Sequence, residues 1–236
     1  MEGEVFLPHP SNGSLTPALL FDLDGTLVDS VYQHVLAWRD ALERAGLPLA
    51  VWLIHRRIGM SGGLMVNALA REIGHTLTPD EGARILQYHA EAFRQYAAQV
   101  RPLPGARELL AYLAKAAIPH AIATSGRIES AGPTLKTLEV GPDVPVVTRD
   151  QVAHAKPDPD LFLAAAARVG VPIEHSVVVG DSIWDLLAAR RAHALGVGLM
   201  SGGYGQEELE RAGAYRVYQD PADLLAHLDE VGVRGA

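Results

Sequence analysis

Short, uniformly apolar runs recur along the chain, and several of them stop at a polar residue. Residues 18–21 are Ala-Leu-Leu-Phe and end at an acid, which is typical of a strand buried on both faces of a sheet. Comparable runs follow later in the chain. The predicted strands cover residues 18–21, 120–123, 144–147, 176–179, 197–200 and 216–218.

Between these runs, apolar residues recur every three or four positions, which is the spacing of an amphipathic helix. Repeated strand–helix units imply a parallel sheet covered by helices on both faces, and hence an α/β fold of Rossmann-like type. The helices predicted between and after the strands cover residues 106–116, 127–138, 159–169, 183–194, 206–212 and 222–231.

Residues 31–101 differ from the rest of the chain, because they contain helical patterns and no predicted strand. Their last helix has the clearest start, since Thr78 is a good N-cap and Glu81 completes a capping box. Ser30 and Gln33 have the same spacing ahead of the first helix. The four helices predicted here cover residues 31–45, 49–58, 64–73 and 79–99.

The helical stretch separates the first strand from the rest of the sheet. We therefore predict an α/β core domain, formed by residues 17–30 and 102–236, with an all-α helical-bundle cap domain of residues 31–101 inserted after the first strand. Residues 1–16 are rich in proline and glycine and are predicted to form a loose N-terminal tail.

The composition is that of a globular protein, with 236 residues, 48% of them apolar and 20% charged. A net charge of −8 predicts no nucleic-acid partner, because the broad positive field of a nucleic-acid-binding protein is missing. The chain has no cysteine, which excludes disulfides and thiolate catalysis. Without a signal-peptide pattern or a long apolar run, we expect a cytoplasmic protein with no membrane partner.

Polar clusters stand where four predicted strands end or helices begin. Ligands of open parallel sheets bind beyond the carboxyl ends of the strands, so we expect these clusters to meet at one edge of the sheet. Asp22 and Asp24, two positions apart on an extended segment, project to the same side. The clusters are Asp22 with Asp24, Thr124 with Ser125, Lys156 alone, and Asp181 with Asp185.

Three carboxylates brought to one point need a cation. Two unit charges ~4 Å apart repel by roughly 4 kcal/mol at an effective dielectric constant of 20. Carboxylate oxygens with water suit Mg²⁺, which commonly joins protein acids to a phosphate. The ten histidines form no zinc motif. Hydroxyls, free amides and a lysine opposite the metal would surround the other oxygens of a phosphoryl group.

In this order, the four clusters resemble the four motifs of the haloacid-dehalogenase superfamily of hydrolases, over residues 18 to 200. A helical insert directly after the first motif is similar to the branch of phosphoglycolate phosphatases and β-phosphoglucomutases. The resemblance implies a Mg²⁺-dependent phosphatase that acts on a small phosphorylated metabolite, such as phosphoglycolate or a sugar phosphate, through an aspartyl-phosphate intermediate. It is compatible with a monomer or a homodimer.

Carried over residue by residue, the resemblance makes Asp22 the nucleophile and Asp24 the general acid and base. Mg²⁺ would be bound by Asp22, by Asp181 and by the backbone carbonyl of Asp24. Asp185 would order the waters of the metal or the ammonium group of Lys156. These roles agree with chemistry in which a covalent carboxylate intermediate divides one displacement into two.

The resemblance also assigns the residues that hold the phosphoryl group. Thr124 and the backbone amide of Ser125 would bind phosphate oxygens. Lys156 would neutralise negative charge on the nucleophile and on the phosphoryl group. Asp24 argues against a dehalogenase, because a halide leaves without a proton, and against the phosphonate hydrolases, which carry a small residue at this position.

Two other functions remain open at this level. The loop at residues 59–63 lacks the arginine with which β-phosphoglucomutases bind a second phosphate, but Arg56 and Arg57 lie just before it, so a phosphosugar mutase is the alternative enzyme. A phosphate-accepting receiver or binding protein is the alternative outside enzymes. Receivers, however, place their acid pair ahead of the phosphorylated aspartate and lack a helical insert.

Three residues of the insert are candidates for contact with the substrate. His34 lies one helical turn beyond the first motif and either faces the site or packs between the domains. Arg57 either binds a substrate carboxylate or ends a helix in solvent. Ser61 belongs to a glycine-rich loop that either closes over the substrate or joins two helices.

Overall fold

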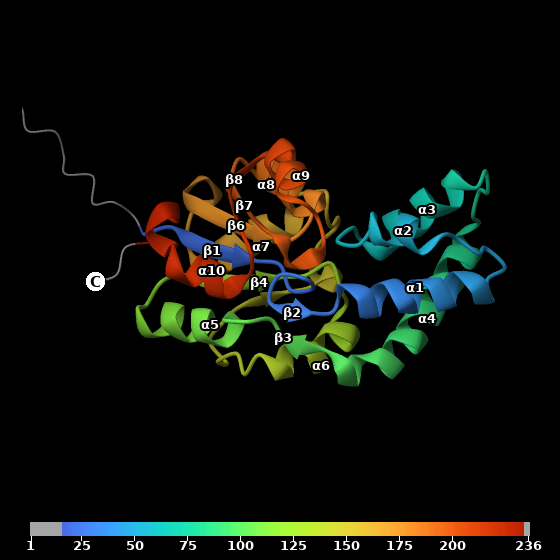
Figure 1. The fold of residues 1–236 in the computed structure, drawn as a ribbon, viewed down its shortest axis with the longest axis horizontal. Helices are drawn as coiled ribbons and strands as arrows, with labels where there is room; N and C mark the ends of the chain where they lie inside the picture. The colour runs from blue at the N-terminus through green and yellow to red at the C-terminus, as the bar shows by residue number, and fades with distance from the viewer. Residues whose placement is uncertain (1–15, 234–236) are drawn as a thin grey trace, which may run out of the picture.

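The computed structural model describes residues 16–233, which form a sheet unit and a helical insert after its first strand (Figure 1). The loose tail predicted over residues 1–16 lies outside the described residues, apart from Thr16. The sheet unit is built from the chain on both sides of the insert. Its first strand is therefore far in sequence from the strands beside it.

Six parallel strands form one sheet in the order β5-β4-β1-β6-β7-β8. β1 lies between β4 and β6, where Leu19 aligns with His120 on one side and with Val177 on the other. All four side chains of β1 are buried, which confirms the prediction from its uniform apolar run. The strands are β1 (Ala18–Phe21), β4 (His120–Ala123), β5 (Val146–Val147), β6 (Ser176–Gly180), β7 (Leu195–Leu199) and β8 (Ala214–Tyr218).

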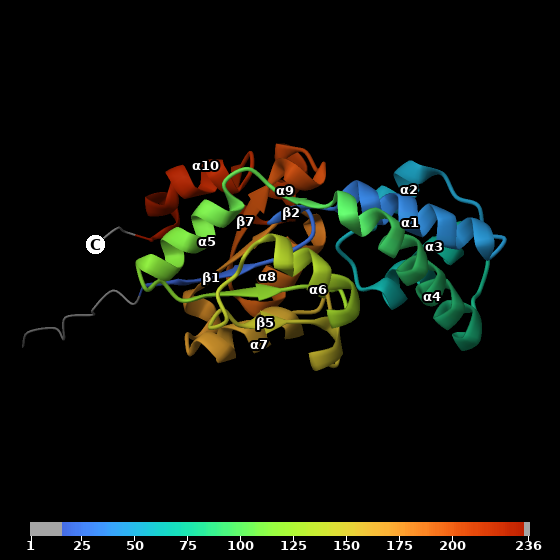
Figure 2. The ribbon, with the colours of Figure 1, turned by 90° about the horizontal axis from the view of Figure 1, so that it is seen from below.

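Alternate residues of β1 pack into two separate cores, one on each face of the sheet. Leu19 and Phe21 join the core beneath α5 and α10, whereas Ala18 and Leu20 join the core beneath α7 and α8. Figure 2 shows α5 and α10 side by side on their face. The helices of this unit are α5 (Ala106–Lys115), α6 (Ile128–Thr137), α7 (Asp160–Val169), α8 (Ile183–Ala192), α9 (Gln206–Ala212) and α10 (Pro221–Ala226). Four short 3₁₀ turns accompany them: η2 (Arg149–Gln151), η3 (Ile173–His175), η4 (Met200–Gly202) and η5 (Leu228–Val231).

Two predicted elements of the sheet unit differ from the structure. The strand predicted over residues 144–147 is reduced to β5, and Pro145 before it has no amide hydrogen to donate to a ladder. The helix predicted over residues 222–231 is divided into α10 and η5. The break is at His227, whose Nδ1 lies 2.8 Å from the carbonyl oxygen of Asp223.

The helical insert has a hydrophobic core of its own. Helices α1 and α4 pack along each other, and Trp38, Leu42, Leu69 and Ile85 are among the side chains buried between the helices. The second helix is much shorter than the predicted residues 49–58. The elements of the insert are α1 (Val31–Arg44), α2 (Val51–His55), α3 (Gly62–Glu72), α4 (Pro79–Tyr96) and η1 (Ala97–Gln99).

The two capping boxes predicted for the insert have different outcomes. The one at α4 is confirmed, since Thr78 Oγ1 accepts from the amide of Glu81 at 3.3 Å and Glu81 Oε2 accepts from the amide of Thr78 at 2.8 Å. The one at α1 is wrong. The hydroxyl of Ser30 donates instead to Asp24 Oδ1 at 2.6 Å, and Gln33 Oε1 is buried without a partner.

A two-stranded antiparallel sheet joins the insert to the sheet unit. It pairs β2 (Val28–Asp29) with β3 (Arg101–Pro102), and Asp29 faces Arg101. No periodicity in the sequence predicts strands of two residues. The chain therefore enters and leaves the insert at neighbouring points.

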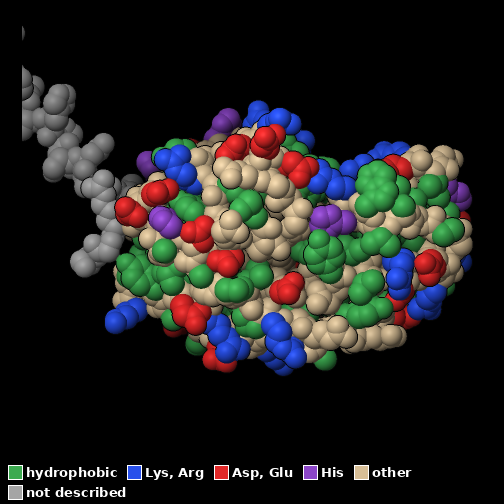
Figure 3. Space-filling model, in the orientation of Figure 1, with side chains coloured by type: hydrophobic (Ala, Val, Ile, Leu, Met, Phe, Trp, Pro, Cys, Tyr) green, Lys and Arg blue, Asp and Glu red, His purple; other side chains and the backbone are tan. Residues whose placement is uncertain are grey.

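The outer surface carries charges of both signs. On the face shown in Figure 3, acidic and basic side chains are interspersed rather than gathered into fields of one sign. Among residues 16–233, no helix combines the length and the apolar character needed to cross a bilayer.

Candidate active site

The polar clusters meet where three neighbouring strands end. β1, β4 and β6 are adjacent and parallel, so their carboxyl ends lie at one edge of the sheet. Each of these strands is followed directly by one residue of the clusters: β1 by Asp22, β4 by Thr124 and β6 by Asp181. β4 and β6 lie on opposite sides of β1. In an open parallel sheet, ligands bind beyond the carboxyl ends of strands arranged in this way.

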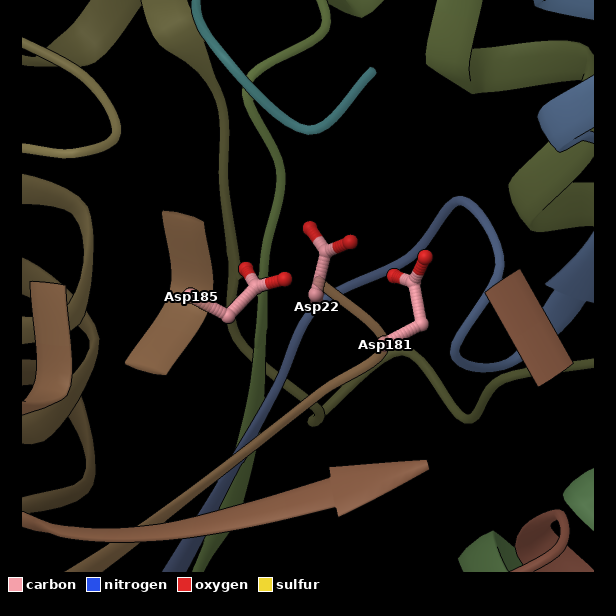
Figure 4. Close-up of side chains that lie close together, drawn as sticks. All are labelled: Asp22, Asp181 and Asp185. Carbon is pink, nitrogen blue, oxygen red and sulfur yellow. The ribbon is translucent and has the colours of Figure 1, made fainter. Parts of the chain in front are cut away.

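Three carboxylates form the centre of this edge (Figure 4). Asp22, Asp181 and Asp185 are buried, and one carboxylate oxygen of each lies within 4.8 Å of the others. Figure 4 shows Asp22 between the other two residues, with the three carboxylate groups on the same side. The described residues thus bring together the acids of the first and fourth sequence clusters.

Lys156 is the cation of this centre. Its side chain is fully buried, and its Nζ contacts Asp22 Oδ1 and lies 2.7 Å from Asp185 Oδ1. Burial alone would lower the pKa of Lys156, but Asp185 and Asp22 raise that pKa above its ordinary value. The lysine is therefore held in its charged form.

One lysine does not balance three buried carboxylates. Burial, together with Asp185 and Asp24, raises the pKa of Asp22 to about 7 even though Lys156 opposes the shift. Burial and the neighbouring Asp185 and Asp22 raise the pKa of Asp181 well above its ordinary range. The donor set is all oxygen and carries excess negative charge, so it fits a hard divalent cation.

The turn after Asp24 is shaped around Asp181. Gly25 has φ +84°, and a Cβ there would lie 2.5 Å from Asp181 Oδ2, so only glycine fits. The hydroxyl of Thr26 donates to Asp181 Oδ1 at 3.1 Å. The first and fourth clusters are thus fixed to each other by backbone shape and by a buried hydrogen bond.

Asp24 lies beside this centre, between Ser30 of the sheet unit and His34 of the insert. Its Oδ1 accepts from Ser30 Oγ at 2.6 Å and lies 3.3 Å from His34 Nε2. Burial alone would raise the pKa of Asp24, but His34 and Ser30 lower that pKa below its ordinary value. The imidazole of His34 also stacks on Phe93 with 3.9 Å between ring centroids, so His34 both faces the site and packs inside the insert.

Asp185 is fixed through the start of α8. Its Oδ2 accepts from the hydroxyl of Ser182 at 2.6 Å and from the amide of Ser182 at 3.1 Å. Its Oδ1 faces Lys156, so both oxygens have neighbours within the protein. This placement agrees with the predicted role of ordering Lys156, which itself stays a prediction.

A cavity of about 480 Å³ lies between the sheet edge and the insert. From the sheet unit, Asp22, Asp24, Thr124 and Ser125 line it, and from the insert Ser61 is one of the residues that line it. Lys156, Asp181 and Asp185 lie behind this lining. The predicted nucleophile, the predicted acid and two of the three predicted phosphate-binding residues, Thr124 and Ser125, therefore face one space.

Arg57 does not line the cavity. Its guanidinium contacts Glu72 within the insert. Arg56 was one reason to consider a phosphosugar mutase as the alternative function. It pairs with Glu208 at 2.5 Å and lies over the ring of Tyr204. The contact with Glu72 gives no support to the prediction that Arg57 binds substrate.

The insert is held directly against the sheet unit. The amide of Ser61 donates to the carbonyl of Lys156 at 3.1 Å, and the hydroxyl of Ser125 donates to the carbonyl of Gly59 at 3.3 Å. On the other side of the loop, the hydroxyl of Tyr204 donates to the carbonyl of Arg56 at 3.0 Å. Tyr204 and Glu208 were not predicted, because no local pattern in the sequence links them to residues about 150 positions away.

Comparisons with known proteins agree with this geometry. The family model of haloacid dehalogenase-like hydrolases matches residues 16–193. A phosphoglycolate phosphatase of Rhodospirillum rubrum is 33% identical over 217 residues, which are 88% of each chain. A hydrolase of Pseudomonas syringae of known structure is 55% identical, with a TM-score of 0.89 over 91% of this chain and 99% of its own.

A further solved structure, a family hydrolase of Deinococcus radiodurans with bound phosphate and sodium, is 30% identical, with a TM-score of 0.70 over 93% of this chain and 98% of its own. The family match spans more than half of the chain, and it includes the carboxylates, the lysine and the whole insert. The chain is therefore an enzyme of the haloacid dehalogenase-like hydrolase family, and within it the chain is similar to phosphoglycolate phosphatases.

Proposed function

We propose that the protein is a Mg²⁺-dependent phosphatase that hydrolyses a small phosphorylated metabolite through an aspartyl phosphate on Asp22. The observation that carries the proposal is the buried carboxylate centre, whose Asp22 lines the cavity with Lys156 in contact behind it. The relatives of the chain include phosphoglycolate phosphatases, which supports hydrolysis of a phosphate monoester.

The metal would be held by the carboxylates of Asp22 and Asp181 and by the backbone carbonyl of Asp24. Once bound, Mg²⁺ supplies positive charge that draws the phosphate oxygens toward the nucleophile and offsets charge in the transition state. The raised pKa values of Asp22 and Asp181 support this assignment, because they report charge that a cation would compensate.

In the first step, a carboxylate oxygen of Asp22 attacks phosphorus and the bond to the leaving oxygen breaks. Asp24 donates a proton to that oxygen, so the product leaves as an alcohol. The negative phosphoryl group beside Asp24 would raise its pKa and favour the proton-bearing form. Thr124, the amide of Ser125 and Lys156 would hold the phosphoryl oxygens and offset their charge.

In the second step, water attacks the phosphorus of the aspartyl phosphate. Asp24, now a carboxylate, takes a proton from that water, and the bond between phosphorus and Asp22 breaks. Inorganic phosphate leaves and Asp22 is free again. The loop that contains Gly59 and Ser61 bonds the sheet unit beside this cavity and covers one side of the site where water attacks.

The decisive assay is release of phosphate by the purified chain with Mg²⁺, first from p-nitrophenyl phosphate and then from a panel of phosphorylated metabolites. Steady turnover is expected, and a single phosphorylation without turnover would indicate a receiver instead. Asp22→Asn should lose about 10³-fold or more in kcat, whereas the exposed Asp80→Asn on α4 should match the natural chain. A tenth of normal activity in Asp22→Asn would contradict the covalent mechanism.

A further inference from the structure

The two walls of the cavity differ in chemistry. The sheet unit presents carboxylates and hydroxyls, which the proposed reaction uses. The insert presents mostly apolar side chains to the part of the cavity that the leaving group would occupy. These side chains are Trp38, Ile58, Met60, Leu64, Met65 and Leu86.

The insert places no lysine or arginine at this wall. Residues 31–100 contain no lysine, and none of their arginines lines the cavity. Two arginines directly precede the lining residue Ile58 in sequence, but both form ion pairs away from the cavity, Arg56 with Glu208 and Arg57 with Glu72.

The ionisable residues of the insert that do line the cavity are His34 and His89. His34 lies against Asp24. Burial, together with the neighbouring His34, lowers the pKa of His89 well below its ordinary value, so its ring is neutral at pH 7. That ring stacks on Trp38 with 3.9 Å between centroids, which extends the apolar wall.

Three basic side chains of the sheet unit also line the cavity, and each has a partner of its own. Arg127 pairs with Asp150 at 3.3 Å and is 69% exposed. Arg149 donates to the carbonyl of Val152 at 2.7 Å. The third, His154, lies 3.3 Å from Asp160. All three basic side chains are thus engaged by groups of the sheet unit itself.

We propose that the natural substrate is a phosphate ester of an uncharged, mainly apolar alcohol, and that a second anionic group on the leaving side is selected against. This inference rests on the proposed phosphatase function. A carboxylate on the leaving group, as in phosphoglycolate, would lose water at this wall without gaining a cation. The leaving group of an apolar alcohol gains binding free energy by burying its carbon surface there. Ser61 belongs to the same lining, so its hydroxyl is available to bond a neutral polar group of the substrate.

The test compares three esters with the full chain and Mg²⁺: phosphoglycolate, its neutral carboxamide and n-butyl phosphate. The carboxamide has the same size as phosphoglycolate, so the comparison isolates the charge. We expect kcat/KM for the carboxamide and for n-butyl phosphate, the two esters with an uncharged leaving group, to exceed that for phosphoglycolate by about tenfold or more. A kcat/KM for phosphoglycolate equal to or above that of the carboxamide would overturn the inference alone. Absence of phosphate release from every ester, p-nitrophenyl phosphate included, would overturn the proposed function and this inference with it.

A matched pair of variants tests the wall itself. Leu64 and Ile73 are each 43% exposed, so a lysine is tolerated at both positions, but only Leu64 lines the cavity. Leu64→Lys should raise the phosphoglycolate-to-carboxamide ratio of kcat/KM by about fivefold, because it adds the missing cation. Ile73→Lys should leave the ratio unchanged. An unchanged ratio in Leu64→Lys would show that charge at this wall does not select the leaving group, and the inference would fail.

Discussion

Replacing Lys156 with methionine tests whether this lysine balances the charge of the buried centre. Methionine keeps much of the apolar stem but removes the ammonium group, which lies 2.7 Å from Asp185 and also contacts Asp22. The side chain is 0% exposed, so water cannot replace the lost charge. Breaking a buried ion pair from one side costs about 3–5 kcal/mol of unfolding free energy.

For a chain of this length, a loss of 1 kcal/mol lowers Tm by about 2–4 °C, so Lys156→Met should lower Tm by about 6–20 °C in EDTA. Urea denaturation followed by circular dichroism gives the free energy directly. Added Mg²⁺ should recover part of the loss, because a bound cation stabilises the folded state by mass action. The exposed Lys115→Met should change the free energy by less than about 0.5 kcal/mol.

Adding Asp185→Asn to Lys156→Met distinguishes charge from packing. If the lysine acts through its charge, removing one facing carboxylate should return a substantial part of the lost stability, so the two substitutions should not be additive. The reasoning would be refuted by a loss below about 1 kcal/mol in Lys156→Met. It would also be refuted if Asp185→Asn lowered stability equally in both backgrounds.

Three further outcomes are expected. Asp24→Asn should lose more activity on an alkyl phosphate than on p-nitrophenyl phosphate and should give a burst of p-nitrophenol followed by very slow turnover, because the same group protonates the leaving oxygen and activates water; equal losses without a burst in stopped-flow traces would leave Asp24 only a structural role. EDTA should abolish activity and Mg²⁺ should restore it while Ca²⁺ substitutes poorly, since its looser coordination displaces the phosphoryl group; full activity in EDTA would contradict the metal role of Asp181. Glu208→Gln should raise KM about two- to fivefold with little change in kcat, because it weakens the partly exposed ion pair with Arg56 that links the insert to the sheet unit. The hydrogen bond from Arg56 lowers the pKa of Glu208, so the contribution of this pair is present above the ordinary pKa of a glutamate and is lost as pH falls through the lowered value. A KM that rises equally in Glu207→Gln would argue against a role of the Arg56–Glu208 pair.

The sheet and the position of its site were predictable because the relevant signals are local. β1 is a short apolar run that ends at Asp22, and β6 is a similar run that ends next to Asp181. Parallel strands place such endpoints at one edge, so neighbouring strands were enough to bring the acids together. The contacts of Lys156 with Asp22 and Asp185 were expected from the family resemblance, although its burial could not be seen in the sequence.

Other features lacked a local signal. β2 and β3 are two residues long, too short to show any period. Ser30 and Gln33 have the spacing of a capping box, yet the hydroxyl of Ser30 donates to the carboxylate of Asp24 and makes no cap, a charge-assisted hydrogen bond that the spacing does not reveal. The pairing of Arg56 with Glu208 depends on how the insert lies on the sheet unit, which no pattern within either segment determines.

The pairing of β2 with β3 has a consequence for how the chain folds. Leu19 must find His120 in the sheet, and about 100 residues separate them, which makes loop closure slow. Once the insert has folded and Asp29 faces Arg101, the path between the two strands shortens to roughly 30 residues. By the logarithmic dependence of closure entropy on length, this saves about 1 kcal/mol, so an early-folding insert would accelerate assembly of the sheet about fivefold. The helices that cover the candidate active site thus also bring together the strands that carry the proposed catalytic acids during folding.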